Sequence, residues 1–235
     1  AMGETMSITS DASRWRYAGA FFRLNYSYDN RYLFEVNGRY DGSSKFPNNS
    51  QWGFFPSASA AWRLSEERFW KVDPKFLSNV KLRMSYGALG NSNVNPYSYL
   101  EKFSLSTFST TGTSTDGRYL DGSAKLRYTK NPSQIPDNIG WETSKTVDVG
   151  IDLGFLHNKI TLSADYYVRK TIDMYTVGPT LPDTFGASSP KGNYADMSTY
   201  GYEISLGYND SFKLADRPLS FGVKVTLADY YSVID

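Results

Sequence analysis

The sequence predicts an all-β protein, an antiparallel sheet of about eight strands that forms part of the wall of a transmembrane β-barrel. Apolar and polar residues alternate in segments of about ten residues, which is the period of a strand and not of a helix. Aromatic residues make up 16% of the chain, and aromatic side chains favour strands. The connections between segments alternate between short and long, as they do in bacterial outer-membrane barrels.

The first three strands are expected between Tyr17 and Leu64. Residues 1–15 carry no hydrophobic period and predict a loop or an extended segment leading into the barrel segment, which covers 16–235. Asp29-Asn30 predicts a tight hairpin turn between the first two strands. The stretch 41–53 is rich in turn residues and predicts a connection to the third strand.

Five further strands are expected, at 80–86, 146–155, 160–169, 200–208 and 219–227. The fifth and sixth expected strands show the cleanest alternation and are joined by a short turn at 156–158. Residues 88–140, rich in Gly, Ser, Thr, Asn and Pro, predict a loop too long for a compact soluble domain but ordinary on the outer side of a barrel. We therefore expect the connections 41–53, 88–140 and 171–199 to be extracellular.

Composition excludes several classes of protein. The net charge is +1, which gives nucleic-acid binding no electrostatic advantage. There is no cysteine and only one histidine, so thiol nucleophiles and histidine-rich metal sites are excluded. We find no phosphate-binding loop and no nucleophile elbow. The sequence therefore predicts no enzymatic activity, no catalytic residue, no metal and no cofactor.

Four long segments carry a family resemblance. They are RYDGSSKFPNNSQWGFFPSASAAWRLSEE (39–67), NVKLRMSYGALGN (79–91), WETSKTVDVGIDLGFLHNKITLSADYYVRKTIDM (141–174) and LPDTFGASSPKGNYADMSTYGYEISLGY (181–208). In these segments the chain resembles the SusC/RagA-like family of TonB-dependent outer-membrane transporters, over nearly all residues after Ser13.

The resemblance implies a 22-stranded barrel with an N-terminal plug domain, in the outer membrane of a Gram-negative bacterium. It also implies energy supplied through the TonB complex, a SusD-like surface lipoprotein as partner, and uptake of glycan oligosaccharides or peptides as nutrients. The plug domain is absent from this chain, which ends at Asp235 and not at the usual terminal aromatic residue. We therefore expect a part of the barrel from its C-terminal half.

The candidate site residues fall into two groups. Charged residues on the polar side of the strands are expected to face the lumen and to contact substrate or plug, or simply to form ion pairs on a solvated wall; they are Arg23, Glu35, Arg39, Arg63, Arg83, Asp148, Asp152, Asp165 and Glu203. Loop aromatics are expected to contact ligand, with loop packing or contact with a lipoprotein lid as the alternative; they are Tyr97, Tyr99, Tyr119 and Phe185.

Aromatic residues near the strand ends are expected to form membrane-interface girdles, because amphipathic rings favour that depth. They are Tyr26, Tyr28, Tyr32, Tyr40, Trp62, Tyr86, Tyr166, Tyr200 and Tyr208.

Two other architectures fit the same alternation. A complete eight-stranded barrel with a structural or adhesion role could fill its interior with side chains. A secreted β-sandwich that binds glycans would also alternate apolar and polar positions. Detergent dependence would separate the sandwich from both barrels.

Overall fold

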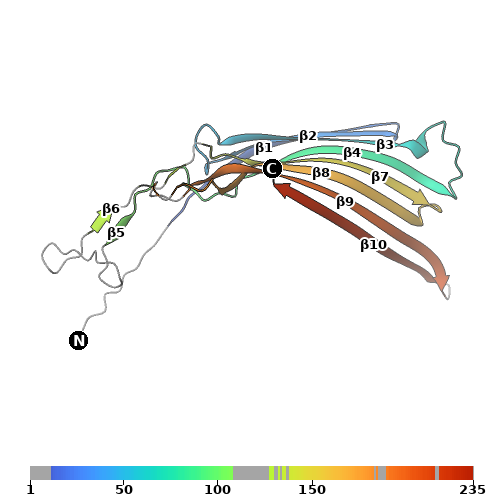
Figure 1. Ribbon diagram of the computed structural model, residues 1–235. Helices are drawn as coiled ribbons and strands as arrows, with labels where there is room; N and C mark the ends of the chain where they lie inside the picture. Colours follow the sequence, from blue (N-terminus) through green and yellow to red (C-terminus); the bar gives the residue numbers. More distant parts are fainter. Residues whose placement is uncertain are drawn as a thin grey trace, which may run out of the picture.

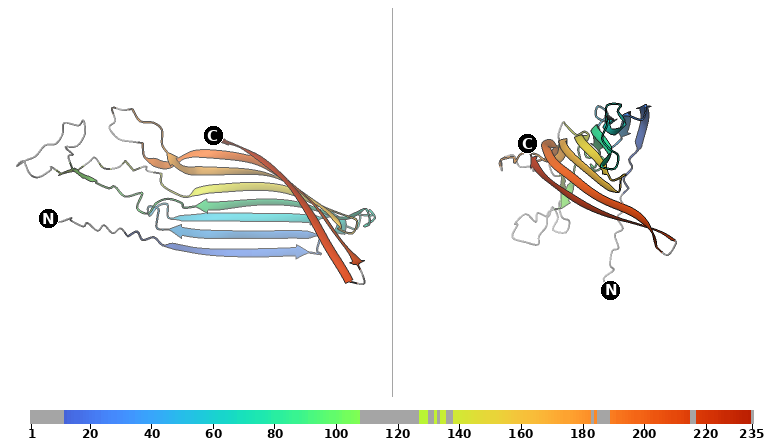
Figure 2. Two further views of the ribbon diagram at one scale, coloured as in Figure 1. Left: turned by 90° about the horizontal axis from the view of Figure 1, so that it is seen from below. Right: turned by 90° about the vertical axis from the view of Figure 1, so that its right-hand side faces the viewer.

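A computed structural model shows a single curved layer of long strands (Figures 1 and 2). It describes residues 12–107, 127–129, 138–182, 189–214 and 217–234, with the short pieces 132, 134–135 and 184. The eight long strands are β1 (Tyr17–Tyr28), β2 (Tyr32–Ser43), β3 (Trp52–Arg63), β4 (Leu77–Asn91), β7 (Glu142–Phe155), β8 (Ile160–Val177), β9 (Lys191–Leu214) and β10 (Arg217–Ile234). A separate two-stranded sheet pairs β5 (Leu105–Thr107) with β6 (Arg127–Thr129).

The eight strands lie side by side in the order in which they occur along the chain, and each neighbouring pair is antiparallel. This confirms the predicted fold class. Among the described residues β1 pairs only with β2, and β10 pairs only with β9, so both edges of the sheet are open. An open single layer disagrees with both a closed eight-stranded barrel and a two-sheet sandwich.

Several strands are longer than their hydrophobic alternation predicts. β4 continues to Asn91, β8 continues to Val177, and β9 and β10 are separated by two residues, where a connection over 209–218 was expected. The reason is that the backbone ladder does not depend on side-chain polarity. The extensions of β4 and β8 mix apolar and polar residues on the same face, as in Lys170, Ile172, Met174 and Thr176, so the alternation weakens and periodicity does not detect them.

The connections alternate between the two ends of the sheet and are shorter at one end, except that 64–76 is longer than 44–51 at the other. Residues 29–31, 64–76 and 156–159 join strands at one end, and 44–51, 92–141 and 178–190 join them at the other, where the chain also enters β1 and leaves β10 (Figure 2). Asp29 and Asn30 take positive φ angles of 49° and 54°, the left-handed conformation that these residue types tolerate best. The 64–76 connection holds a short 3₁₀ helix, η1 (Leu64–Glu66).

The strand register divides the side chains between two faces. Tyr86, Val147, Val168, Tyr200 and Tyr231 are paired in one row across β4, β7, β8, β9 and β10. Side chains two residues away along each strand share that face, so all the aromatics predicted to form girdles lie on it. We call this side the apolar face and the opposite side the polar face.

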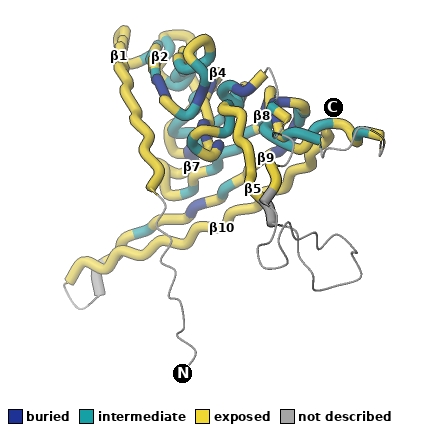
Figure 3. Tube along the Cα trace, turned by 90° about the vertical axis from the view of Figure 1, so that its left-hand side faces the viewer, coloured by how far each residue is buried: buried dark blue, intermediate teal, exposed yellow. Residues whose placement is uncertain are grey.

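Most of the sheet is exposed, as the tube in Figure 3 shows by its colour. Large apolar side chains such as Phe22 (48% exposed), Val149 (52%) and Leu227 (58%) lie open on the apolar face. Among the described residues the buried hydrophobic side chains are few: Phe46, Phe55, Val80, Ala88, Val94 and Ile139. No helix of the described residues is long and apolar enough to cross a membrane.

One carboxylate joins two hairpins at the end with short connections. Glu67 Oε1 accepts hydrogen bonds from the Tyr32 hydroxyl (2.6 Å) and from Trp62 Nε1 (3.0 Å), and its Oε2 accepts one from Arg31 Nη1 (3.2 Å). The rings of Tyr32 and Trp62 are stacked with centroids 6.3 Å apart. The hydrogen bonds from Tyr32, Trp62 and Arg31 hold the pKa of Glu67 below its usual value.

The assignment of the two faces predicts that a charge introduced on β9 lowers the free energy of unfolding more on the apolar face than on the polar face. Ile204→Arg places a charge in the middle of the apolar face and is expected to lower the free energy of unfolding by about 2–4 kcal/mol in lipid vesicles. Ser205→Arg, one residue along and therefore on the polar face, serves as the control and is expected to cost less than about 1 kcal/mol. Urea titration of the two variants measures the difference, and equal losses would contradict the assignment.

The contacts of Glu67 predict a pH dependence. Because the folded-state pKa is lowered, the stability that Glu67 contributes is fully present above its unfolded pKa of about 4.3 and is lost as the pH falls through the folded pKa. Between about pH 6 and pH 3, Glu67→Gln should therefore lose less stability than the wild type. The neighbouring exposed Glu66→Gln variant should follow the wild type. Urea midpoints across this range give the slopes, and parallel slopes for all three proteins would refute the prediction.

Candidate functional site: the polar face of the sheet

The polar face brings the predicted charged residues together. Cross-strand pairing places Arg23 opposite Asn37, Arg39 opposite Phe21, and Glu35 opposite Asn25 and Ser59. Cross-strand pairing extends this face through β4, β7, β8 and β9, where it carries Arg83, Asp148, Asp152, Asp165 and Glu203. All the charged residues proposed from the sequence to face a lumen therefore lie on one side of the sheet. That this side borders a lumen remains a prediction.

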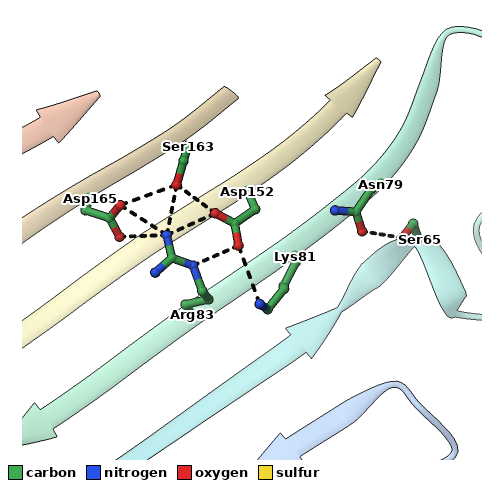
Figure 4. A network of polar contacts seen from close by, with 7 residues as sticks. All are labelled: Ser65, Asn79, Lys81, Arg83, Asp152, Ser163 and Asp165. Atoms are coloured by element: carbon green, nitrogen blue, oxygen red, sulfur yellow. Dashed lines mark hydrogen bonds and ion pairs between the residues drawn. The ribbon is translucent and has the colours of Figure 1, made fainter. Parts of the chain in front are cut away.

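Arg83 on β4 is the centre of a polar network across three strands (Figure 4). Its Nη2 lies 2.8 Å from Asp165 Oδ1 on β8, 3.0 Å from Asp152 Oδ1 on β7 and 3.0 Å from the Ser163 hydroxyl. Nε lies 2.9 Å from Asp152 Oδ2 but is not aligned for a hydrogen bond, so that contact is electrostatic. Ser163 in turn donates to Asp152 Oδ1 at 2.7 Å. One guanidinium thus holds two carboxylates.

A glycine makes room for this network. Gly150 on β7 lies in register between Arg83 and Asp165. A Cβ atom at this position would collide with the Asp165 carboxylate and would come within 2.9 Å of Arg83 Nη2. The side-chain pair therefore meets over the backbone of β7, and a larger residue at 150 would displace the Asp165 carboxylate from its present position.

The centre of the polar face carries acidic and basic side chains side by side. Lys81 Nζ lies 3.5 Å from Asp152 Oδ2. Asp148 lies opposite Ser85, two residues along from Gly150, and Glu203 lies directly opposite Asp165. Arg63 lies opposite Lys81, and Lys224 on β10 lies opposite Gly207 on the same face, so the acids Asp148, Asp152, Asp165 and Glu203 are mixed with four basic side chains. This part of the face presents carboxylate acceptors suited to hydroxyl, amide and cationic groups.

Towards β1 the charges form separate pairs. Arg23 Nε lies 3.4 Å from Glu35 Oε1, with the Arg23 side chain 63% exposed. Arg39 donates from Nε and Nη2 to the two carboxylate oxygens of Asp41, at 3.0 and 3.1 Å. Arg63 lies at the end of β3, opposite Lys81. Exposed ion pairs of this kind contribute at most about 1 kcal/mol each to the free energy of unfolding. Their main effect is therefore to keep this face polar.

The loop aromatics proposed as ligand contacts have structural contacts where the structure describes them. The Tyr97 hydroxyl accepts a hydrogen bond from the backbone N–H of Arg14 and donates to its carbonyl oxygen, at 3.2 and 3.0 Å. Tyr99 packs against the cluster of Phe46, Val94 and Ile139. Tyr119 and Phe185 lie outside the described residues. Ligand contact by these four residues remains a prediction.

Sequence reasoning did not find the packed cluster at the end with long connections. Trp141 packs against Phe46 and Phe55, with ring centroids 5.1 and 5.3 Å away, and its Nε1 donates to the Gln51 carbonyl oxygen at 3.1 Å. Buried Asn193 accepts a hydrogen bond from the Gly140 N–H at 3.0 Å. These contacts hold 44–51, 138–141 and the start of β9 together. The feature of the sequence that could have indicated this cluster is Trp141, a tryptophan directly after Gly140.

Within the described residues, no group of three or more His, Cys, Asp or Glu side chains could hold a metal ion. The acids of the polar face are instead neutralised by Arg83 and Lys81 or are spread along different strands.

Together, the apolar outer face, the charged opposite face, the aromatic rows and the antiparallel strands in chain order define the wall of a transmembrane β-barrel. Comparison with known proteins identifies the family. Residues 4–233 match the family model described as "TonB dependent receptor-like, beta-barrel". The chain belongs to this family, and its relatives are SusC/RagA-like, as the resemblance indicated.

The chain is 37% identical to TonB-dependent receptor P3 of Formosa agariphila over 202 residues, which is 86% of the chain and 19% of the relative. It is 35% identical to TonB-dependent receptor SusC of Bacteroides thetaiotaomicron over 200 residues, 84% of the chain and again 19% of the relative. The fold is similar to a structure of the RagAB peptide transporter, with a TM-score of 0.70 and 22% identity over 92% of this chain and 22% of that one. The chain thus spans about one fifth of the length of these relatives.

Family membership places the protein in the outer membrane of a Gram-negative bacterium. In that setting, the apolar face meets lipid.

The network around Arg83 predicts that replacing this arginine lowers the free energy of unfolding more than replacing the exposed Arg23 does. Arg83→Gln leaves Asp152 and Asp165 without their shared partner and should lower the free energy of unfolding by about 2 kcal/mol. Adding Asp165→Asn should recover at least about 0.5 kcal/mol, since the two residues are in contact. The control Arg23→Gln removes an exposed pair and should cost less than about 0.5 kcal/mol. Urea unfolding in vesicles measures all three, and additive effects of Arg83→Gln and Asp165→Asn would contradict a coupled network.

Proposed function

We propose that the protein takes part in TonB-dependent import across the outer membrane, with the polar face of this sheet lining the path of the substrate. The observation that carries the proposal is the continuous charged face, which extends from Arg23 on β1 to Glu203 on β9 opposite a face that meets lipid. A polar lumen and an apolar outside are what such a wall requires.

The proposed cargo is a glycan oligosaccharide. Similarity to SusC supports this choice. So does the chemistry of the face, because Ser163, Asp152, Asp165, Asn37 and Ser57 offer carboxylate, amide and hydroxyl groups that pair with sugar hydroxyls.

A peptide cargo is the second candidate. The observation in its favour is the fold similarity to the RagAB peptide importer, at a TM-score of 0.71. The acids around Arg83 would suit the amino groups of a peptide as well as they suit hydroxyls.

The proposal includes an orientation and two partners. The connections expected to be extracellular, within 41–53, 88–140 and 171–199, would capture substrate under a SusD-like lipoprotein, and RagAB is a solved complex of a related fold. Tyr97 and Tyr99, with Tyr119 and Phe185, would lie on this side. The TonB complex would act on a plug domain beyond this chain, within a barrel of 22 strands as the resemblance implies.

Cargo class can be tested by uptake in the native host. Cells that carry the complete gene should accumulate fluorescently labelled oligosaccharides, and deletion of the gene or collapse of the proton-motive force should abolish accumulation. Labelled peptides of similar mass serve as the matched alternative. Uptake of peptides but not glycans would replace the first cargo with the second, and uptake that survives loss of the proton-motive force would contradict TonB-dependent transport.

A further inference from the structure

The 64–76 connection exposes large apolar side chains that the joining of two strands does not require. Phe69 is 62% exposed and Phe76 is 68% exposed. The other two connections at this end of the sheet are tight turns, whereas 64–76 is several times longer. Apolar side chains that gather on an exposed segment mark a surface of interaction with a protein or a membrane.

Both ends of this connection contact side chains of the apolar face. Glu67 accepts hydrogen bonds from Tyr32 and Trp62, which lie on that face. At the other end, the ring of Phe76 lies edge-on against the ring of Phe155 with centroids 6.4 Å apart. Phe155 is the last residue of β7 and shares the apolar face with Val147 and Val149. The connection is therefore held on the side of the sheet that meets lipid.

Hydrogen bonds fix the connection to its neighbours. Ser65 Oγ donates to Asn79 Oδ1 at 3.4 Å on the polar side, so the chain crosses the rim of the sheet directly after this residue. Ser78 Oγ donates to the Pro74 carbonyl oxygen at 2.7 Å and accepts a hydrogen bond from the Asn158 N–H at 3.2 Å. The exposed phenylalanines thus belong to a segment whose two ends are held in place.

A row of aromatic residues gives the depth of the connection in the membrane. Tyr28, Tyr32 and Trp62 are paired across β1, β2 and β3. Tyrosine and tryptophan on a lipid-facing surface lie at the boundary between lipid and water. Because Glu67 bonds to two of these three residues, the connection begins at the level of the headgroups.

The charges of the connection are balanced. Its bases are Arg68, Lys71 and Lys75, and its acids are Glu66, Glu67 and Asp73. Equal numbers of acids and bases give little attraction to anionic lipid, and they suit headgroups that carry both signs of charge. Burial of apolar side chains is then the force that would hold the connection at the membrane.

We propose that the 64–76 connection is a membrane anchor, which binds zwitterionic phospholipid by inserting the rings of Phe69 and Phe76 among the acyl chains. Its charged side chains extend into the headgroup layer. In the orientation proposed above, this is the periplasmic leaflet. The anchor continues the lipid contact of the apolar face and does not depend on the cargo.

Spin labels on single cysteines test the anchor in the complete protein, reconstituted into phosphatidylcholine vesicles. This chain has no cysteine, and any cysteine elsewhere in the protein is replaced by serine. Labels at Phe69→Cys and Phe76→Cys should be accessible to oxygen, shielded from a water-soluble nickel chelate, and about 5–10 Å below the phosphates. The references are Val149→Cys, in the middle of the apolar face, and Asn30→Cys, in the tight turn at the same end.

The label at residue 69 is decisive, because Phe69→Cys leaves the contacts of Glu67 and Phe76 in place. Shielding from nickel with access to oxygen at this position supports the anchor. Access to nickel equal to that of the Asn30→Cys label overturns it, and shielding from both probes overturns it in favour of a protein contact. Insertion that requires added phosphatidylglycerol overturns the choice of lipid. None of these failures touches the transport proposal, because uptake of cargo is measured separately.

Discussion

The structure depends on the requirement that backbone N–H and C=O groups in lipid find partners within the sheet. Hydrocarbon offers no hydrogen bonds, and each unpaired group costs several kcal/mol. Within the eight-stranded sheet, the six inner strands have a partner on both sides, whereas β1 and β10 have a partner on one side only. The ladder also fixes which side chains share a face, so the aromatic rows, the charged face and the Arg83 network all follow from one register.

The two faces use that register in opposite ways. On the apolar face, side chains such as Val149 and Leu227 gain their stabilisation from lipid and not from a packed protein core, which explains how so exposed a surface belongs to a folded protein. On the polar face, Arg83 reaches across β7 because Gly150 has no side chain there.

Much of this arrangement follows from the sequence alone, because an alternation of period two indicates both the strand and the face. It correctly placed Tyr86 and Tyr200 on one side and Arg83 and Asp165 on the other. It failed where the ladder outlasts the alternation, as in β9 beyond Tyr208 and β8 beyond Arg169. Contacts between distant segments, such as Trp141 with Phe46 or Glu67 with Tyr32, carry no periodic signal, since they depend on how connections fold back on the strands.

Glu67 has a further consequence for how the hairpins choose their alignment. Tyr32 and Trp62 are direct partners in the β2 and β3 ladder, and both donate to the same carboxylate oxygen. A slip of β3 by one residue would turn Trp62 to the opposite side of the sheet, and a slip by two would separate the two donors by about 7 Å. Only the native alignment brings a phenol and an indole to one oxygen atom. Glu67 thus favours the native pairing of β2 with β3 at the end of the sheet opposite the 44–51 connection that joins these two strands.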